Sequence, residues 1–462
     1  MDEHAFRARI HAAEARFAEG DAGGALEDLE RVRRDAPLRS RVWAEAMADI
    51  AVVLHGAGNL ADAYAHARHA LIAAPGLDEA RETMEICAES LGLQLEHAAG
   101  GERVLLVVDH FTPSRGGTEL LAHDLAVELT GLGHPVEVLC RPHPDRARGG
   151  EGAPVHEAPP ELAERALTGL LASGRFATVI GISGPIGFPV LGVLQHPLLA
   201  RVHSLVVPCV NEEFDGTVRG APAFLRDYAR MLLRADAVGY SSRAGWDHRL
   251  LDDLGVPGVY LPNAVPRVEP HGGIRELIGA SADDAVILHV ANLWPQKNHL
   301  AFLDELRRSP GDWRLACIGG PSLDHPRLAH EVAAAAARDP RVTLLGPGTR
   351  EDVAGAMREA DLLVLPSIAE ATPLVLLEAM SHGLPWLVSD TCESASDLAG
   401  GRIVAHAGFA AAIEELLANP AARVQLGEAG RAAYAAGYSW EAVAPRYLAA
   451  IRPLGDALPR AA

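Results

Sequence analysis

Buried strands and amphipathic helices alternate along most of this chain, in two successive series. The first series contains the apolar runs 103–108, 135–140, 177–182, 204–210, 237–242 and 258–263. The second contains the runs 285–292, 314–320, 342–346, 361–367 and 385–390. Strands that are joined through helices form parallel sheets, because the chain must cross a face of the sheet between them. The sequence therefore predicts two Rossmann-like, doubly wound α/β domains, at 102–268 and 275–436.

The segments that connect and follow these two domains have predicted roles of their own. Residues 264–282 are rich in proline and glycine, which suits a hinge, and 96–102 suits a linker. Residues 437–462 are expected to form a C-terminal helix that packs back toward the N-terminal α/β domain. Facing crevices at the carboxyl ends of the strands would then hold ligands, as they do in sheets of this kind.

The first 98 residues predict helices only, with an internal repeat. Gly20, Ala25 and Pro37 recur 38 positions later as Gly58, Ala63 and Pro75. Small residues let paired helices approach closely, and each proline stops its helix. The pattern resembles a tetratricopeptide-type array of helical hairpins, although that array usually has a period of about 34 residues. The alternative is a generic helical bundle.

Charge and hydropathy narrow the class of protein. The formal charge is −20, from 61 acidic against 41 basic residues, which argues against a broad nucleic-acid interface. No apolar run reaches the roughly 18 residues that a membrane span needs, and the charged N-terminus does not resemble a signal peptide. The five scattered cysteines suit a reducing compartment. We therefore expect a cytoplasmic protein, and a peripheral contact with a membrane is compatible with these features.

The segment 367–390 places two carboxylates, Glu370 and Glu378, in an otherwise apolar and small-residue run. Thr372 and Pro373 predict the start of a helix, with the threonine as N-cap and the proline at the first helical position. The free N–H groups at such a helix start, here those of Leu374, Val375 and Leu376, suit a phosphate. Carboxylates on the flanks of the helix suit vicinal hydroxyls. The segment therefore predicts a site for a phosphorylated sugar, and two solvated acids on a buried helix are the alternative.

The motif Glu-x7-Glu within "PSIAEATPLVLLEAMSHGLP" resembles the signature of the retaining glycosyltransferases of family 4. Other stretches match that family too: "GGTE" at 116–119, "YLPNAV" at 260–265, "VANLWPQKNH" at 290–299, "LLGPGTREDV" at 344–353 and "ADLLVLPS" at 360–367. The resemblance covers roughly residues 103–452. It implies the GT-B fold, in which two Rossmann-like domains face each other, here preceded by the all-α repeat region.

The resemblance also implies roles for individual residues. Glu378 would hold the ribose of a nucleoside-diphosphate sugar, Glu370 would contact the donor hexose, and Lys297 would bind the diphosphate. Glu370 and Lys297 are the expected catalytic residues. The expected donor site comprises Gly116, Gly117, Asn292, Lys297, Gly346, Pro347, Glu370, Thr372, Pro373, Leu374, Val375 and Glu378. No cofactor and no metal are expected, because the sequence has neither an Asp-x-Asp pair nor a metal-spaced His/Cys cluster.

Two departures from the family concern the acceptor side and the phosphates. Ala291 and Asn292 stand where many members have Gly-Arg, so Arg115 is a candidate for the missing cation. Asn211 stands where many members have a histidine. We expect His110, at the end of the first strand, with Arg115 and Asn211 to lie on the acceptor side.

Other functions fit the sequence less well. A dinucleotide dehydrogenase needs GxGxxG after the first strand, and the loop here is "DHFTPSRGG". A sugar-nucleotide epimerase of the same fold remains an alternative. So does an inactive scaffold whose repeats bind a protein. For residues 1–98 we predict that they recruit a protein partner or a second copy of the chain, the competing view being that they only stabilise the neighbouring domain.

Overall fold

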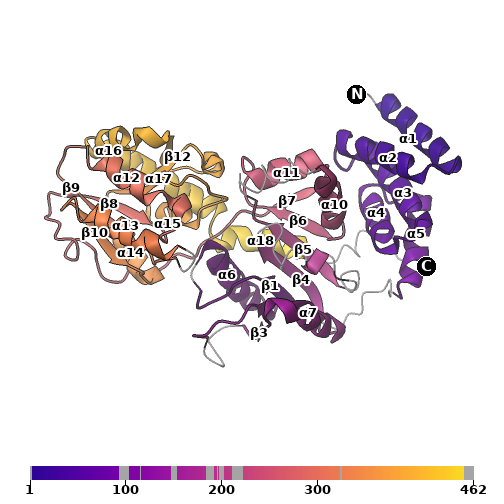
Figure 1. Cartoon of the computed structure of the whole chain (residues 1–462), viewed down its shortest axis with the longest axis horizontal. Coiled ribbons are helices and arrows are strands. Elements are labelled where there is room, and N and C mark those ends of the chain that lie inside the picture. Colours follow the sequence, from indigo (N-terminus) through magenta and orange to yellow (C-terminus); the bar gives the residue numbers. More distant parts are fainter. Residues whose placement is uncertain are drawn as a thin grey trace.

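The computed structural model of the chain describes residues 3–92, 103–114, 116–146, 153–183, 192–194, 196, 202–210, 222–322 and 325–451. The proposed linker at 96–102 lies outside these residues. The chain forms three bodies in a row: the helical repeats, a first α/β domain and a second α/β domain (Figure 1). The predicted architecture, helices followed by two Rossmann-like domains, is confirmed.

The N-terminal region is a stack of antiparallel helices. Its described helices are α1 (Glu3–Ala18), α2 (Ala22–Asp35), α3 (Arg41–Gly56), α4 (Leu60–Ala73) and α5 (Asp78–Ser90). The spacing between the starts of α1 and α3, and between those of α2 and α4, equals the spacing of the sequence repeat, so one repeat corresponds to one helical hairpin. Gly20 and Gly58 each follow the first helix of a hairpin with φ of 92° and 79°, a backbone conformation that favours glycine.

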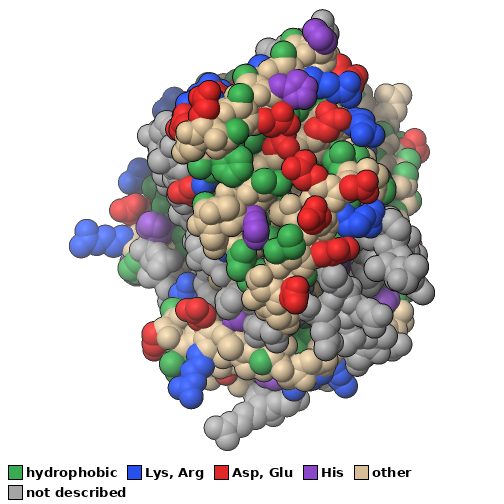
Figure 2. Space-filling view, turned by 90° about the vertical axis from the view of Figure 1, so that its right-hand side faces the viewer, with side chains coloured by type: hydrophobic (Ala, Val, Ile, Leu, Met, Phe, Trp, Pro, Cys, Tyr) green, Lys and Arg blue, Asp and Glu red, His purple; other side chains and the backbone are tan. Residues whose placement is uncertain are grey.

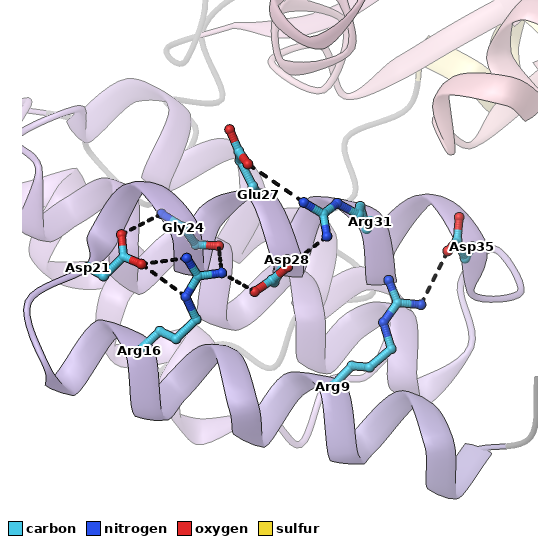
Figure 3. A network of polar contacts seen from close by, with 8 residues as sticks. All are labelled: Arg9, Arg16, Asp21, Gly24, Glu27, Asp28, Arg31 and Asp35. Carbon is cyan, nitrogen blue, oxygen red and sulfur yellow. Dashed lines mark hydrogen bonds and ion pairs between the residues drawn. The ribbon is translucent and has the colours of Figure 1, made fainter.

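Charged contacts bind the first hairpin together (Figure 3). The guanidinium of Arg16 on α1 donates to the carboxylates of Asp21 and Asp28, at 2.5 Å each, and to the carbonyl of Gly24 at 3.2 Å. Asp21 in turn accepts the N–H of Gly24 at 2.9 Å and thereby caps α2. Arg16 thus joins the end of α1 both to the turn and to α2.

The first α/β domain is built on a parallel sheet with the strand order β3-β2-β1-β4-β5-β6-β7. Its strands are β1 (Arg103–Val108), β2 (Val136–Cys140), β3 (Val155–Glu157), β4 (Phe176–Ser183), β5 (His203–Pro208), β6 (Ala237–Tyr240) and β7 (Gly258–Tyr260). The described helices around it are α6 (Gly117–Gly131), α7 (Ala163–Ala172), α10 (Pro222–Leu232) and α11 (Trp246–Leu254), and a 3-10 turn at Pro160–Leu162 precedes α7.

The second α/β domain has the parallel order β10-β9-β8-β11-β12-β13. Its strands are β8 (Ala285–Val290), β9 (Trp313–Ile318), β10 (Val342–Gly346), β11 (Leu362–Leu365), β12 (Trp386–Ser389) and β13 (Gly401–Val404). Its helices are α12 (His299–Leu306), α13 (Pro326–Ala336), α14 (Arg350–Glu359), α15 (Leu374–His382), α16 (Phe409–Leu417) and α17 (Pro420–Gly437), with 3-10 turns at Pro295–Lys297, Glu393–Asp397 and His406–Gly408.

The last helix, α18 (Trp440–Ile451), lies on the first α/β domain rather than on the second (Figure 1). The ring Nε2 of His203 on β5 and the carbonyl of Ala450 form a hydrogen bond of 3.0 Å, and the hydroxyl of Thr178 donates to the carbonyl of Ile451 at 3.4 Å. The chain therefore crosses between the α/β domains twice, once through residues 261–284 and once between α17 and α18.

The sequence analysis did not identify strands β3 and β13, which lie at edges of the two sheets. Their residues are half-buried or exposed, so they carry no apolar run of the kind that marks the central strands. Both pair along one side only, with β2 and with β12, and the missing strands leave the order of the predicted ones unchanged.

The repeats pack tightly against the first α/β domain. One continuous apolar cluster includes residues of α1 to α5 together with one face of the first sheet, for example Leu105, Val107 and Val179. Polar contacts border this cluster: Arg33 Nη1 donates to the carbonyls of Leu254 and Gly255, Arg68 pairs with Asp236, His69 bonds to the carbonyl of Ala235, Arg230 pairs with Glu30, and Arg234 pairs with Asp62. The region thus shares a core with the domain that follows it.

Gly255 shows how close this contact is. Its φ is 62°, and a Cβ added there would lie 2.8 Å from the Cα of Arg34 in the repeats. Both the backbone conformation and the close approach require glycine at this position. The repeats therefore contact the first α/β domain directly at the C-cap residue of helix α11.

Candidate active site

The tip of helix α15 lies where the two α/β domains meet. The helix begins at Leu374, one residue later than the sequence predicts, and Pro373 is its N-cap residue with φ of −73° and ψ of 119°. The prediction of Thr372 as N-cap is wrong. The Thr372 hydroxyl instead shares a hydrogen bond of 2.9 Å with Ser241, and the Thr372 carbonyl accepts from Asn263 Nδ2 at 3.0 Å. Thr372 thus ties α15 to the first α/β domain.

Lys297 and Glu370 form an ion pair beside this helix. The Lys297 Nζ lies 2.5 Å from Glu370 Oε1, and the side chain of Glu370 is only 9% exposed. Lys297 belongs to the turn after β8 and Glu370 to the loop after β11, and these two strands are neighbours. Asn298 ends the lysine turn with φ of 57°, and its Nδ2 donates to the carbonyl of Pro366 at 3.1 Å. A cation and a carboxylate are therefore held together at the carboxyl edge of the second sheet.

The start of helix α6 faces the start of helix α15 across the domain boundary. A Cβ added at Gly117 would lie 3.9 Å from Leu374 Cγ, so the first residues of the two helices are in contact distance. Helix α6 begins at Gly117, with Gly116 as its N-cap residue. The N–H of Leu376, which the sequence analysis expected to be free, donates to the carbonyl of Pro373 at 3.3 Å. Both helix starts carry the positive end of a helix dipole, which suits an anion.

Glu119 is a residue of this site that the sequence analysis missed. A Cβ added at Gly116 would lie 2.2 Å from its carboxylate Oε2, so the side chain lies directly over the glycine. Burial raises the pKa of Glu119, while the nearby His110 opposes that shift. The quoted motif "GGTE" contained the residue, but no rule of local sequence indicates that its side chain folds back over the glycine pair.

Glu378 lies in the second turn of α15, close to a second interdomain pair. Arg350, the first residue of α14, donates to both carboxylate oxygens of Asp124 on α6, at 2.6 and 2.7 Å. Burial raises the pKa of the Glu378 carboxyl, the charge of Arg350 lowers it and that of Asp124 raises it. The sequence analysis did not single out Arg350 or Asp124, which are 226 positions apart.

Three further residues of the expected donor site lie along one wall. Asn292 Oδ1 accepts the N–H of Gly320 at 3.0 Å, and a Cβ added at Gly320 would lie 3.6 Å from Pro347. Gly346 has φ of 75°, which lets the chain turn sharply between β10 and α14. This wall connects the lysine turn with the first turn of α14.

The expected acceptor residues are described only in part. His110 is exposed at the end of β1, near Glu119. Arg115 and Asn211 lie outside the described residues. Between the α/β domains, additional contacts that the sequence did not predict come from Asp397, whose carboxylate accepts from Ser242 Oγ at 2.7 Å and from the Arg243 N–H at 2.6 Å.

Lys297 is already paired with Glu370, so Glu378, which the family resemblance assigns to a ribose, offers the cleaner test of the expected donor site. We expect Glu378→Ala to weaken nucleoside-diphosphate binding by about 1.5–3 kcal/mol, the range for a hydrogen bond to a charged group. Calorimetric titration of the folded variant measures it. An affinity equal to that of the wild-type protein would remove Glu378 from the ribose assignment.

Comparison with known proteins finds similarity to glycosyltransferases. Residues 284–419 match the family model for glycosyl transferases group 1. The chain is 33% identical over 207 residues to D-inositol 3-phosphate glycosyltransferase of Mycobacteroides abscessus, covering 42% of this chain and 45% of that protein. It is 32% identical over 216 residues to the protein of the same name in Mycobacterium tuberculosis, covering 43% of each. The chain spans less than half the length of these curated relatives.

Solved structures resemble the two α/β domains over nearly their whole length. Sucrose-phosphate synthase from Thermosynechococcus elongatus has a TM-score of 0.64 at 20% identity, covering 77% of this chain and 99% of that one. Anabaena HepE in complex with UDP and glucose has a TM-score of 0.62 at 16% identity, covering 75% and 98%. The fold is GT-B. Ligands of doubly wound sheets bind at the carboxyl ends of the strands, where the contacts described above lie. Among the described helices, none combines the length and the apolar character that crossing a membrane requires.

Proposed function

We propose that this chain is a retaining glycosyltransferase that moves a hexosyl-type sugar from a nucleoside-diphosphate sugar to an acceptor, without a metal ion. The observation that carries the proposal is the Lys297–Glu370 pair at the tip of α15, opposite the start of α6. The match of residues 284–419 to glycosyl transferases group 1 supports it. So does the likeness in fold to HepE, which was solved with UDP and glucose.

The chemistry follows from the charges that this arrangement holds in place. When the bond between the sugar and the diphosphate breaks, its electron pair stays on the diphosphate, whose negative charge rises. Lys297 and the N–H groups of Leu374 and Val375 would stabilise this charge more in the transition state than in the ground state. Glu370 would release Lys297 to the phosphates and accept hydrogen bonds from hydroxyls of the hexose.

A screen of nucleotides tests the proposal directly. The melting temperature should rise with a nucleoside diphosphate or its sugar, since a ligand that binds only the native state stabilises it. Incubation with the sugar nucleotide that binds best should then give slow hydrolysis or transfer, and the anomeric configuration of the product, read by NMR, tests retention. Interconversion of two sugar nucleotides would favour the epimerase, and binding without any turnover would favour the inactive scaffold.

Metal independence is a separate prediction. If fixed cations and helix N–H groups take the place of a divalent ion, turnover should be unchanged in EDTA. Loss of turnover in EDTA that Mg²⁺ or Mn²⁺ restores would contradict the proposed mechanism. A parallel melting curve in EDTA controls for a metal that merely stabilises the fold.

The acceptor and the partner of the repeats are finer parts of the proposal. A small phosphorylated polyol is one candidate acceptor, because the curated relatives are named for D-inositol 3-phosphate. The repeats would recruit a protein or a second copy through the face opposite the first α/β domain, where acidic side chains gather (Figure 2). Light scattering on the whole chain tests self-association. The cytoplasmic location also remains a prediction from sequence.

A further inference from the structure

Two buried histidines adjoin the lysine turn, the 3-10 turn Pro295–Lys297. His289 lies on β8 and is 1% exposed, and His299 is the first residue of α12 and is 3% exposed. Their Nε2 atoms lie 3.1 Å apart, and Nδ1 of His289 lies 2.9 Å from the carbonyl oxygen of Val364 on β11. The two rings therefore form a chain of hydrogen bonds that joins the end of the lysine turn to β8 and β11.

The direction of each hydrogen bond in this histidine chain follows from the chemistry of its members. A carbonyl oxygen can only accept, so His289 Nδ1 carries a hydrogen and donates it to Val364. Burial lowers the pKa of His289 to about 4 and the pKa of His299 to about 2, so both rings are neutral near pH 7. His289 Nε2 then holds a lone pair and accepts the Nε2–H of His299. An apolar ring at position 299 would leave that buried lone pair without a donor.

The histidine chain begins where the pairing of β8 with β11 ends. Those strands pair at Ile287 with Leu362 and at Leu288 with Leu363. One residue further along β8, the side chain of His289 bonds to the β11 carbonyl. The histidine chain thus continues the connection between the two strands toward the edge at which Lys297 and Glu370 meet.

The lysine turn is also joined to the loop that carries Glu370. The carbonyl of Gln296 accepts the N–H of Ile368 at 2.8 Å, and Asn298 Nδ2 donates to the carbonyl of Pro366 at 3.1 Å. These two bonds connect a turn with a loop, so they do not prevent the turn and the loop from shifting together. The histidine chain differs from them, because it anchors the end of the turn to strands inside the sheet.

We propose that His299 and His289 are positioning residues, whose hydrogen bonds hold Lys297 where the diphosphate leaves. Both rings are buried, so they act through the lysine turn and not on the substrate itself. A catalytic group that is held in its productive position keeps its full effect on the transition state, and one that moves away loses part of it. The inference rests on the proposed function, which assigns Lys297 to the leaving group.

The first measurement is steady-state kinetics of His299→Phe and His299→Gln, with the donor and acceptor pair found in the nucleotide screen. Phenylalanine keeps a ring at this position but cannot donate, whereas the amide N–H of glutamine donates in the same direction. We expect His299→Phe to lower turnover by about 10- to 10²-fold, the scale of a displacement of about 1 Å at a catalytic group, with little change in nucleotide affinity. His299→Gln should keep more of the turnover than His299→Phe.

A double-mutant cycle with Lys297→Ala separates positioning from general support of the fold. If the histidines act through the lysine, His299→Phe should change turnover by less than about 2-fold in a protein that already lacks the lysine, whereas independent effects multiply. His69→Phe is the matched control, because His69 is also buried and bonds to a carbonyl, that of Ala235, at 3.0 Å. It should lower the melting temperature and leave the turnover of the folded protein equal to that of the wild type.

The possible results separate the inference from the proposed function. Effects of His299→Phe and Lys297→Ala that multiply overturn the inference alone, and so does equal turnover of His299→Phe and His299→Gln. Wild-type protein that turns over no sugar nucleotide overturns the proposed function and the inference with it. If His299→Phe fails to fold, the double variant His289→Phe/His299→Phe replaces it, because replacing both partners leaves no ring nitrogen unpaired. The turnover of this double variant should fall as well, and a wild-type rate would overturn the inference.

Discussion

Lys297→Ala should lower the turnover of sugar transfer by about 10²–10³, with a smaller effect on nucleotide affinity. This is the largest effect on activity that we expect. The lysine lies at the carboxyl edge of the second sheet, 2.5 Å from Glu370, so its ammonium is already held where the leaving diphosphate would gain charge. A cation beside the leaving group stabilises charge that grows in the transition state, so it lowers the barrier more than it strengthens ground-state binding.

The measurement is steady-state kinetics on the donor and acceptor pair found in the nucleotide screen. Arg402→Ala is the matched control, because it removes an exposed cation of the same domain that pairs only with Glu415 among the described residues. Equal melting temperatures of Lys297→Ala and the control exclude unfolding as the cause of a lower rate. Turnover close to that of the wild type would show that the lysine does not stabilise the leaving group.

Arg68→Ala should lower the free energy of unfolding by about 3–5 kcal/mol, the largest effect on stability that we expect. Arg68 on α4 pairs with Asp236 of the first α/β domain at 2.8 Å, and the side chains are 8% and 5% exposed. The variant leaves Asp236 buried with a lone negative charge. The ion pair lowers the pKa of that carboxyl, despite its burial, so losing Arg68 removes its main stabilisation.

Urea unfolding followed by tryptophan fluorescence and by circular dichroism measures the change, with Arg31→Ala as control. Arg31 also pairs with acidic residues of the repeats, but it is 51% exposed, so its loss should cost less than about 1 kcal/mol. Equal stability of Arg68→Ala and Arg31→Ala would show that the repeats are not stabilised through this contact. The same result would favour repeats that fold independently of the first α/β domain.

Local sequence was sufficient to predict the elements that the core requires. The central strands of both sheets are continuous apolar runs, because a strand covered by helices on both faces has no polar side. Each unit of the N-terminal repeat forms one helical hairpin, since glycine and proline interrupt the helices at each turn. The edge strands β3 and β13 were missed because half-buried residues carry no such signal.

The sequence analysis assigned Lys297 and Glu370 to one donor site, and the strand order of the second sheet brings them together. They come after β8 and β11, which are neighbours in a parallel sheet, so both side chains emerge at the same edge. The N-cap prediction at Thr372 failed because a contact with another part of the chain decided the helix start. The Thr372 hydroxyl shares a hydrogen bond with Ser241 instead.

What the sequence by itself determined is therefore the central strands, the helical repeat, the parallel direction of the strands and the two edges at which ligands would bind. These features depend on the periodicity of apolar residues and on the backbone preferences of residues that are close in the sequence. The tertiary structure alone decided which side chains from different domains meet: Arg350 with Asp124, Arg68 with Asp236, and the starts of α6 and α15. Such pairs join positions that lie far apart in the chain, and their partners are chosen by how whole domains pack, which no local pattern encodes.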